Sequence, residues 1–258
     1  MRDQGLAEAI RAIGGVGELA RQIGISQPSV SNWNRIPAER VIAVEAVSGV
    51  DRVTLRPDLY GGKKMAGDID EVDAARAQEY ALIAALLSRA PDAKLLSDLS
   101  ELRADATPLG IAHAGLAEAA SNAKVERVER EYFDLFIGLG RGELMPYGSY
   151  YLTGFLHDRP LARLRDDLAK FGIARAEGVV EPEDHAGILC EIMSGLANGR
   201  LPAPSGSDRI IFDAHFAPWI GRFFTDLESA EAAGFYRRVG TLGRIFVDIE
   251  AEAFDLPS

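Results

Sequence analysis

Apolar residues recur every three or four positions through the first fifty residues, which is the spacing of one face of an α-helix. The pattern predicts four helices, over about 5–13, over about 16–23, from Ser26 to about Arg35, and after Pro37. Gly14-Gly15 separates the first two helices, and Gly24 supplies the left-handed residue that commonly ends a helix. The side chain of Ser26 is suited to cap the third helix. We therefore expect a small helical bundle in this part of the chain.

The remaining sequence also has helical periodicity, in longer stretches. The two clearest apolar stripes are Val125-Val128-Tyr132-Leu135 and Phe235-Val239-Leu242-Phe246-Ile249. Sustained alternation of apolar and polar residues, which indicates β-strands, is absent from the sequence. The predicted fold class is therefore all-α. We expect a helix-turn-helix domain over 1–60, a linker rich in glycine and lysine over 61–70, and a larger helical bundle over 71–258.

The second and third predicted helices have the pattern of a helix-turn-helix motif. Ala20 is small where two helices cross closely, and Ile25, Val30 and Trp33 can hold the second helix against the first. The opposite face carries the candidate DNA-binding residues, which are Gln27, Ser29, Ser31, Asn32 and Arg35. Such side chains can reach base edges and phosphates in the major groove. The alternative interpretation is a helical bundle whose polar face only meets water.

The segments Ile36-Pro37-Ala38-Glu39-Arg40-Val41 and Leu55-Arg56-Pro57-Asp58-Leu59-Tyr60 extend this motif. With them, residues 5–60 resemble the Cro/YdaS-like phage repressor family. The resemblance implies a module that binds operator DNA as a homodimer, through half-sites about one helical turn apart. A fold derived from a repressor can also lose DNA binding and serve as a docking module, and this alternative stays open.

The segment Glu181-Pro182-Glu183-Asp184-His185 predicts the start of a helix. Proline suits an early helical position, and acidic residues in the first turn oppose the positive end of the helix dipole. His185 is in helical register with Leu189, Ile192 and Leu196. Two interpretations follow. The histidine is either a hydrogen-bonded residue at the edge of the core, or a polar point at the lip of an apolar groove.

Further motifs accompany this segment in a fixed order. They are Arg76-Ala77-Gln78-Glu79-Tyr80, Glu131-Tyr132-Phe133-Asp134-Leu135-Phe136, Pro146-Tyr147-Gly148-Ser149-Tyr150-Tyr151-Leu152, Leu161-Ala162-Arg163-Leu164-Arg165 and Gly172-Ile173. Over most of 71–258 the sequence resembles the TorD/DmsD family of redox-enzyme maturation chaperones. One departure is the loop over 137–143, which lacks the proline that the family has shortly after the Leu-Phe pair, so the preference for a client can differ.

The resemblance implies an all-helical binding protein rather than an enzyme. Chaperones of this family hold the twin-arginine signal peptide of a molybdoenzyme catalytic subunit and keep the apoenzyme competent for cofactor insertion before export. Carried over onto this sequence, the client-binding residues are Tyr147, Ser149, Tyr151, Leu152, Glu181, Asp184 and His185. A groove with apolar walls and an acidic rim would complement two guanidinium groups followed by a short apolar stretch.

The formal net charge of −11 is unevenly distributed. Residues 1–65 have a net charge of +2, and residues 66–258 have −13. An acidic body attracts cationic peptides and repels nucleic acid, so the two predicted domains suit different partners. Any DNA binding by the first domain must depend on the local placement of charge, because +2 is only weakly basic.

Several classes of protein are not expected. No apolar run approaches the ~18–20 residues that span a bilayer, and the first residues lack a secretory signal, so we expect a cytoplasmic protein without membrane insertion. Cys190 is the only cysteine, and it lies in an apolar run that predicts a buried, inert thiol. The scattered histidines predict no metal site, and we expect no cofactor and no catalytic residues.

Two functional hypotheses remain. The leading one is a chaperone that binds a twin-arginine signal peptide and is fused to a DNA-binding module. The alternative is a transcriptional regulator that uses the TorD-like part as a sensor of a ligand or client. An enzyme, such as a nucleotide hydrolase, has no motif in its favour, because the glycines over 138–142 lack the lysine and hydroxyl residue of a phosphate-binding loop.

Overall fold

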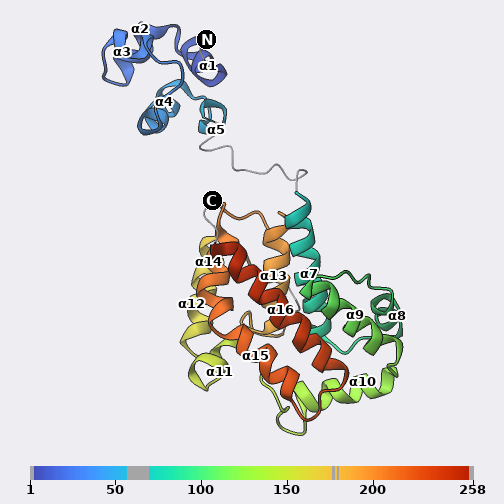
Figure 1. Cartoon of the computed structure of the whole chain (residues 1–258). Helices are drawn as coiled ribbons and strands as arrows, with labels where there is room; N and C mark the ends of the chain where they lie inside the picture. The colour runs from blue at the N-terminus through green and yellow to red at the C-terminus, as the bar shows by residue number, and fades with distance from the viewer. Residues whose placement is uncertain (1–2, 57–69, 176–177, 179, 256–258) are drawn as a thin grey trace. The chain divides into compact units, whose positions relative to one another are not determined.

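The computed structural model describes residues 3–56, 70–175, 178 and 180–255. The chain divides into two compact units, Met1–Asp68 and Ile69–Ser258 (Figure 1). Every regular element among the described residues is a helix, which confirms the predicted all-α class. The predicted linker over 61–70 lies outside the described residues except for Asp70. In the described part of the chain, no helix combines the length and apolarity that crossing a membrane requires.

The smaller unit is built from short helices. They are α1 (Gln4–Ile13), α2 (Val16–Gln22), α3 (Gln27–Ser31), the 3₁₀ helix η1 (Ala38–Arg40), α4 (Val41–Ser48) and α5 (Arg52–Leu55). Side chains cap two of them, because Asp3 accepts a hydrogen bond from the backbone N–H of Gly5 at 2.9 Å and Ser26 accepts one from Ser29 at 3.3 Å. The predicted cap at Ser26 is therefore confirmed.

One apolar cluster holds the smaller unit together. Its buried members are Leu6, Ala9, Leu19, Ala20, Val30, Ile36, Val41, Val44 and Leu55. Ala20 and Val30 lie at the crossing of α2 and α3, as the sequence predicts, while Ile25 and Trp33 are half-buried at the edge of the cluster. Gly5 permits α1 to approach α5, since a Cβ atom there would lie 2.4 Å from the carbonyl oxygen of Thr54.

The third helix is shorter than predicted. It ends at Ser31, so Asn32 and Arg35 lie beyond its end. The chain turns there because Asn34 and Arg35 contact Asp3 at the start of the unit. The backbone N–H of Asp3 donates to Asn34, and the Arg35 guanidinium lies 3.2 Å from the Asp3 carboxylate.

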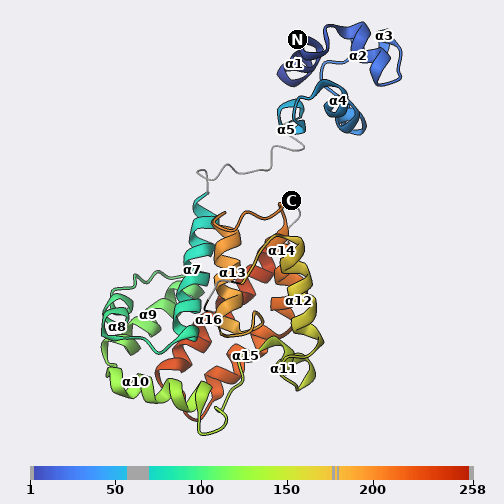
Figure 2. The ribbon, with the colours of Figure 1, turned by 180° about the vertical axis from the view of Figure 1, so that it is seen from behind.

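The larger unit contains longer helices. They are α7 (Glu71–Ser88), α8 (Ala93–Ser100), α9 (Pro108–Ser121), α10 (Val125–Tyr132), the π-helical turn η2 (Phe133–Ile137), α11 (Gly148–Thr153), α12 (Arg159–Lys170), α13 (Ala186–Ala197), α14 (Ser207–Ile211), the π-helical turn η3 (Phe212–Phe216), α15 (Ala217–Ser229) and α16 (Phe235–Asp255). Helices α7 and α13 pack side by side, and α16 packs against α15 and α9 (Figure 2). Helix α12 lies at the outer edge of the bundle beside α11.

The predicted apolar stripes pack into the core of this unit, except that Ile249 at the end of the second stripe is 41% exposed. The aromatic residues Phe212, Phe216, Trp219, Phe223 and Phe224 are all buried and form part of this core. Pro218 lies in the first turn of α15, directly after the π-helical turn, so it begins a helix rather than interrupting one. Cys190 is fully buried, and burial raises the pKa of its thiol. This agrees with an inert thiol.

A buried carboxylate joins the first and last helices of the larger unit. Glu250 on α16 is 1% exposed and receives two hydrogen bonds from the Arg76 guanidinium, at 2.8 and 2.9 Å. The Tyr80 hydroxyl donates a third at 2.8 Å. Burial of a charge is tolerated only when it is paired and hydrogen-bonded, and these contacts meet that requirement. The motif around Arg76 therefore has a structural role.

A second buried carboxylate, that of Glu131 on α10, caps the start of α16. It accepts hydrogen bonds from the backbone N–H groups of Gly234, Phe235 and Tyr236 at 2.7, 3.1 and 2.6 Å. These N–H groups have no partner within their own helix, so the carboxylate replaces the missing acceptors and faces the positive end of the helix dipole. The Glu-Tyr motif is thus explained by helix capping.

Candidate functional site

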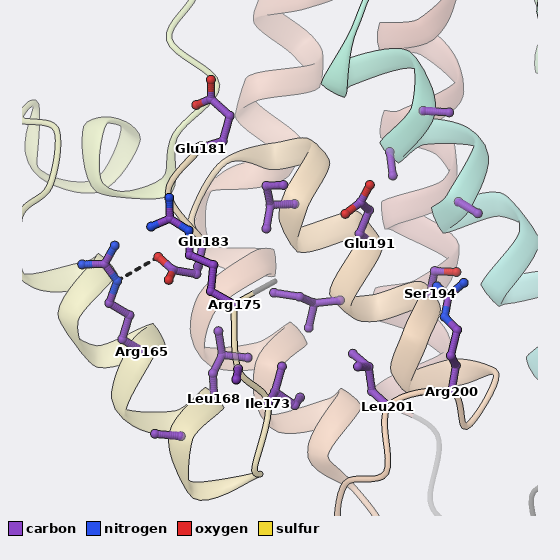
Figure 3. A pocket seen from close by; sticks show the side chains of 17 residues that line it. Arg165, Leu168, Ile173, Arg175, Glu181, Glu183, Glu191, Ser194, Arg200 and Leu201 are labelled. Atoms are coloured by element: carbon purple, nitrogen blue, oxygen red, sulfur yellow. Dashed lines mark hydrogen bonds and ion pairs between the residues drawn. The ribbon is translucent and has the colours of Figure 1, made fainter. Parts of the chain in front are cut away.

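A groove of about 570 Å³ lies between α7, α12 and α13 (Figure 3). Small side chains on α7 line one wall, which are Ala81, Ala84 and Ala85. The larger apolar side chains of the lining are Leu168, Ile173, Ile188, Ile192 and Leu201. Helix α7 packs against α13, and its alanines are too small to fill the space between this pair and α12. An apolar hollow therefore remains open to one side.

Three carboxylates stand at the rim of the groove. Glu181 and Glu183 belong to the segment before α13, and Glu191 is an exposed residue of α13 itself (Figure 3). Glu183 is paired with Arg165 of α12, whose Nε lies 2.8 Å from Oε2 of the carboxylate. The Glu183 side chain is only 12% exposed, against 48% for the arginine. The groove thus combines an apolar lining with charged side chains at its rim.

Arginines also line the groove, so its charge is mixed. Arg175 donates a hydrogen bond to the backbone carbonyl of Val180 at 2.7 Å, which places its guanidinium in the segment that leads to the acidic rim. Arg200 lies at the opposite end, near Leu201 (Figure 3). Carboxylates and arginines therefore share the rim, because Arg165 and Arg175 both lie beside Glu183 at one end of it (Figure 3).

The acidic segment is held in place by the start of α11. Tyr147 and His185 form an isolated antiparallel bridge, and the backbone N–H of Gly148 donates to the Asp184 carbonyl at 2.9 Å. The backbone N–H of Ser149 donates to the Asp184 carboxylate at 2.7 Å. The Pro-Tyr and Glu-Pro-Glu-Asp-His motifs, far apart in the sequence, are therefore two sides of one contact. Their shared function is to fix the loop that presents the rim carboxylates.

His185 caps α13 rather than lying within it. Its Nδ1 accepts a hydrogen bond from the backbone N–H of Gly187 at 3.1 Å, which requires that nitrogen to be unprotonated. Burial lowers the pKa of His185, although the nearby carboxylates of Glu181 and Asp184 oppose the shift. The predicted start of the helix at Pro182 is wrong. The helix begins at Ala186, because the residues before it are held by α11 instead.

Tyr147 links the contact between α11 and the acidic segment to the rim carboxylate of Glu181. Its hydroxyl donates a hydrogen bond to Oε2 of Glu181 at 2.8 Å. Burial and this hydrogen bond both raise the pKa of the tyrosine, because each favours the neutral hydroxyl. The ring packs edge-on against His185, with 5.2 Å between centroids. The hydrogen bond from Tyr147 therefore holds the Glu181 carboxylate in position.

The predicted client-binding residues do not form one surface. Glu181 lines the groove, and Tyr147 and His185 lie behind it. Ser149 and Asp184 are buried, 0% and 3% exposed, and the Ser149 backbone N–H and the Asp184 carboxylate hold the loop, so their contact with the client stays a prediction. Two of the predicted residues lie elsewhere. The Tyr151 hydroxyl donates a hydrogen bond to Asp226 at 2.9 Å, and Leu152 lines a separate cavity of about 270 Å³ that Asp184 also lines.

Sequence reasoning missed most of the groove. Glu183 and Arg165 lie within motifs that the sequence singles out, but nothing in either motif indicates that they pair across two helices. The alanines of α7, together with Glu191 and Arg200, carried no signal, because a helical pattern shows only which face is apolar. Within the described residues, His, Cys, Asp and Glu side chains form no group of three that could hold a metal ion.

The predicted DNA-binding residues lie in the smaller unit. Gln27, Ser29 and Ser31 are exposed on α3, and Asn32 and Arg35 are exposed beyond its end. Ser29 is partly engaged, since its hydroxyl lies 2.7 Å from that of Ser26. Arg35 is engaged with Asp3, as described above. Gln27, Ser31 and Asn32 therefore remain the residues best placed to meet a partner.

Each unit matches the model of a known family. Residues 102–225 match the family model of the nitrate reductase delta subunit, and residues 6–64 match the model of the bacterial toxin YdaS. The first match lies in the unit whose motifs resemble TorD and DmsD. The larger unit is thus similar to the TorD and DmsD proteins, and we call it the TorD-like domain. The smaller unit is correspondingly YdaS-like.

Relatives of the TorD-like domain carry the names of chaperones. Chaperone protein TorD of Vibrio cholerae is 24% identical over 134 residues, which are 48% of this chain and 61% of that protein. The protein named Probable Tat proofreading chaperone DmsD of Haemophilus influenzae is 30% identical over 119 residues, 45% of this chain and 57% of its own. Chaperone protein TorD of Shewanella pealeana is 23% identical and matches 72% of this chain and 92% of its own length.

A solved structure is also similar. It is that of a protein from Archaeoglobus fulgidus described as a redox enzyme maturation protein, at 21% identity and a TM-score of 0.46. The match covers 73% of this chain and 99% of that one. The chain spans about three fifths of the length of the first Vibrio relatives that it matches.

Proposed function

We propose that this protein is a cytoplasmic chaperone that binds the twin-arginine signal peptide of a molybdoenzyme catalytic subunit before export. The observation that supports the proposal is the groove of the TorD-like domain. An apolar hollow with carboxylates at its rim is complementary to a segment that carries two guanidinium groups and a short apolar stretch. The chaperone names of the relatives agree with binding rather than turnover.

The two halves of such a peptide would meet different parts of the groove. Guanidinium groups form paired, charge-assisted hydrogen bonds with carboxylates, so the arginines belong beside Glu181 and Glu183. Apolar side chains after the arginines would cover Leu168, Ile173 and Ile192 and remove them from water. A cavity of this size accommodates a few side chains rather than a whole signal sequence, so we expect only the segment around the arginine pair to be held.

The proposal is tested by titrating the full-length protein with twin-arginine signal peptides from the host's molybdoenzymes. Copies with both arginines changed to lysine serve as the matched control. We expect Kd values at or below about 1 μM for the arginine peptides and a loss of about tenfold or more for the lysine copies, because an ammonium group cannot make the same paired hydrogen bonds. Equal affinity for both copies, or no binding by either, would count against this function.

We further propose that the YdaS-like unit binds operator DNA as a homodimer. The observation in favour is the exposed row of polar side chains on and after α3, which follows the capped turn of a helix-turn-helix. If client occupancy of the TorD-like domain changed DNA affinity, the protein would act as a transcriptional regulator with a client sensor. The DNA proposal does not depend on that coupling.

Selection of binding sites from random DNA, followed by fluorescence anisotropy, tests the second proposal. We expect Gln27→Ala to weaken binding to the selected site by about tenfold, since one specific base contact is worth ~1–3 kcal/mol. Gln4→Ala on α1 is the control, because it removes the same side chain from an exposed position outside the motif. Failure to enrich any sequence would favour the docking-module interpretation of this unit.

A further inference from the structure

We propose that Arg165 is an internal competitor for the client's arginine, and that it occupies Glu183 whenever the groove is empty. This inference rests on the proposed signal-peptide function. It concerns what the ligand must displace rather than where it binds. Because a ligand must displace Arg165 from Glu183, Arg165 would lower the affinity of the groove for the peptide.

The geometry of the pair supports this role. The Arg165 Nε lies 2.8 Å from Oε2 of Glu183, and both residues line the groove (Figure 3). The interaction joins α12 to the segment before α13, so the ion pair bridges one end of the rim. An arginine side chain on Glu183 presents the same planar group that a client arginine would present. The carboxylate therefore already has a guanidinium partner of the kind that it is proposed to recruit.

The two members of the pair differ in how easily they can leave. The Arg165 side chain is 48% exposed, so its guanidinium can return to water with little loss, whereas Glu183 is 12% exposed and needs a cationic partner. Exchange of one guanidinium for another keeps the nearly buried carboxylate neutralised at every stage. A ligand without a cation could not displace Arg165, because it would leave Glu183 unpaired.

The structural alternative is that the pair only fastens α12 to the loop. In that case the loss of Arg165 would loosen the rim and weaken binding. The two interpretations predict opposite signs for one substitution. Affinity measurements therefore distinguish the two interpretations.

The experiment compares the full-length protein with Arg165→Gln and with Arg163→Gln. Arg163 is exposed on the same helix and lines the smaller, separate cavity rather than the groove, so its substitution removes one positive charge without opening Glu183. We expect Arg165→Gln to tighten binding of the twin-arginine peptide roughly threefold to fivefold, the factor equivalent to one partly exposed ion pair. Arg163→Gln should change the affinity by less than about twofold, since a distant surface charge is screened.

A third peptide, with both arginines changed to glutamine, distinguishes the displacement of Arg165 by a peptide arginine from a general loosening of the groove. Its weak binding should be the same for the wild type and Arg165→Gln. A nuclear magnetic resonance signal gives an independent readout, because the Nε–H resonance of Arg165, identified by its absence from the variant, should shift on saturation with the arginine peptide.

The inference is overturned if Arg165→Gln binds the arginine peptide no better than the wild type, or if saturation leaves the Nε–H resonance in place. In both cases the wild type still binds the peptide and the proposed function stands. If neither protein binds any arginine peptide, the proposed function and this inference fail together.

Discussion

Replacing Glu131 by alanine is expected to lower the free energy of unfolding by about 3 kcal/mol, one of the two largest effects anticipated here. The carboxylate accepts three backbone hydrogen bonds at the start of α16, and Phe235 and Tyr236 are buried there. Without Glu131 the N–H groups of Phe235 and Tyr236 would have neither a protein acceptor nor ready access to water. The helix they begin carries much of the core, so the loss should affect the whole TorD-like domain.

The measurement is urea unfolding followed by far-ultraviolet circular dichroism, in which the larger unit contributes most of the helical signal. Glu129→Ala is the matched control, because it removes a glutamate from the same helix at an exposed position. We expect that control to change stability by no more than about 0.5 kcal/mol. A similar small effect for Glu131→Ala would show that the start of α16 finds other acceptors.

The second large effect concerns binding. The double substitution Glu181→Gln and Glu183→Gln is expected to weaken the twin-arginine peptide by about 10- to 100-fold, since each charge-assisted hydrogen bond contributes about 1.5–3 kcal/mol when partly buried and less when exposed. Glutamine keeps the size of each side chain and the hydrogen bond from Tyr147 can persist. The loss would therefore report charge rather than shape.

Glu126→Gln with Glu129→Gln is the charge-matched control for this experiment. Both residues are exposed on α10 and neither lines the groove, so they reduce the net negative charge by the same amount. We expect this control to bind the peptide within about twofold of the wild type at 0.15 M salt, where distant charges are screened. An equal loss in the two double variants would assign the attraction to the acidic body as a whole.

The sequence by itself determined the helical class of this protein and much of its core. Helical periodicity is a local property, so most of a stripe such as that around Phe246 could be assigned without knowing its partners. Capping is equally local, which is why the role of Ser26 was predictable. The resemblance to TorD and DmsD, carried by motifs in a fixed order, is supported by the chaperone relatives.

Only the tertiary structure decided what those motifs do. The Asp184 carboxylate was expected at a rim and is buried instead, because its partner, the backbone of Ser149, comes from a helix that precedes it by 35 residues. The groove also could not be predicted, since its three walls come from α7, α12 and α13, and its shape depends on alanines on α7 that leave space. Pairings between distant segments depend on how helices pack, and the pattern along one helix does not record which helix lies opposite.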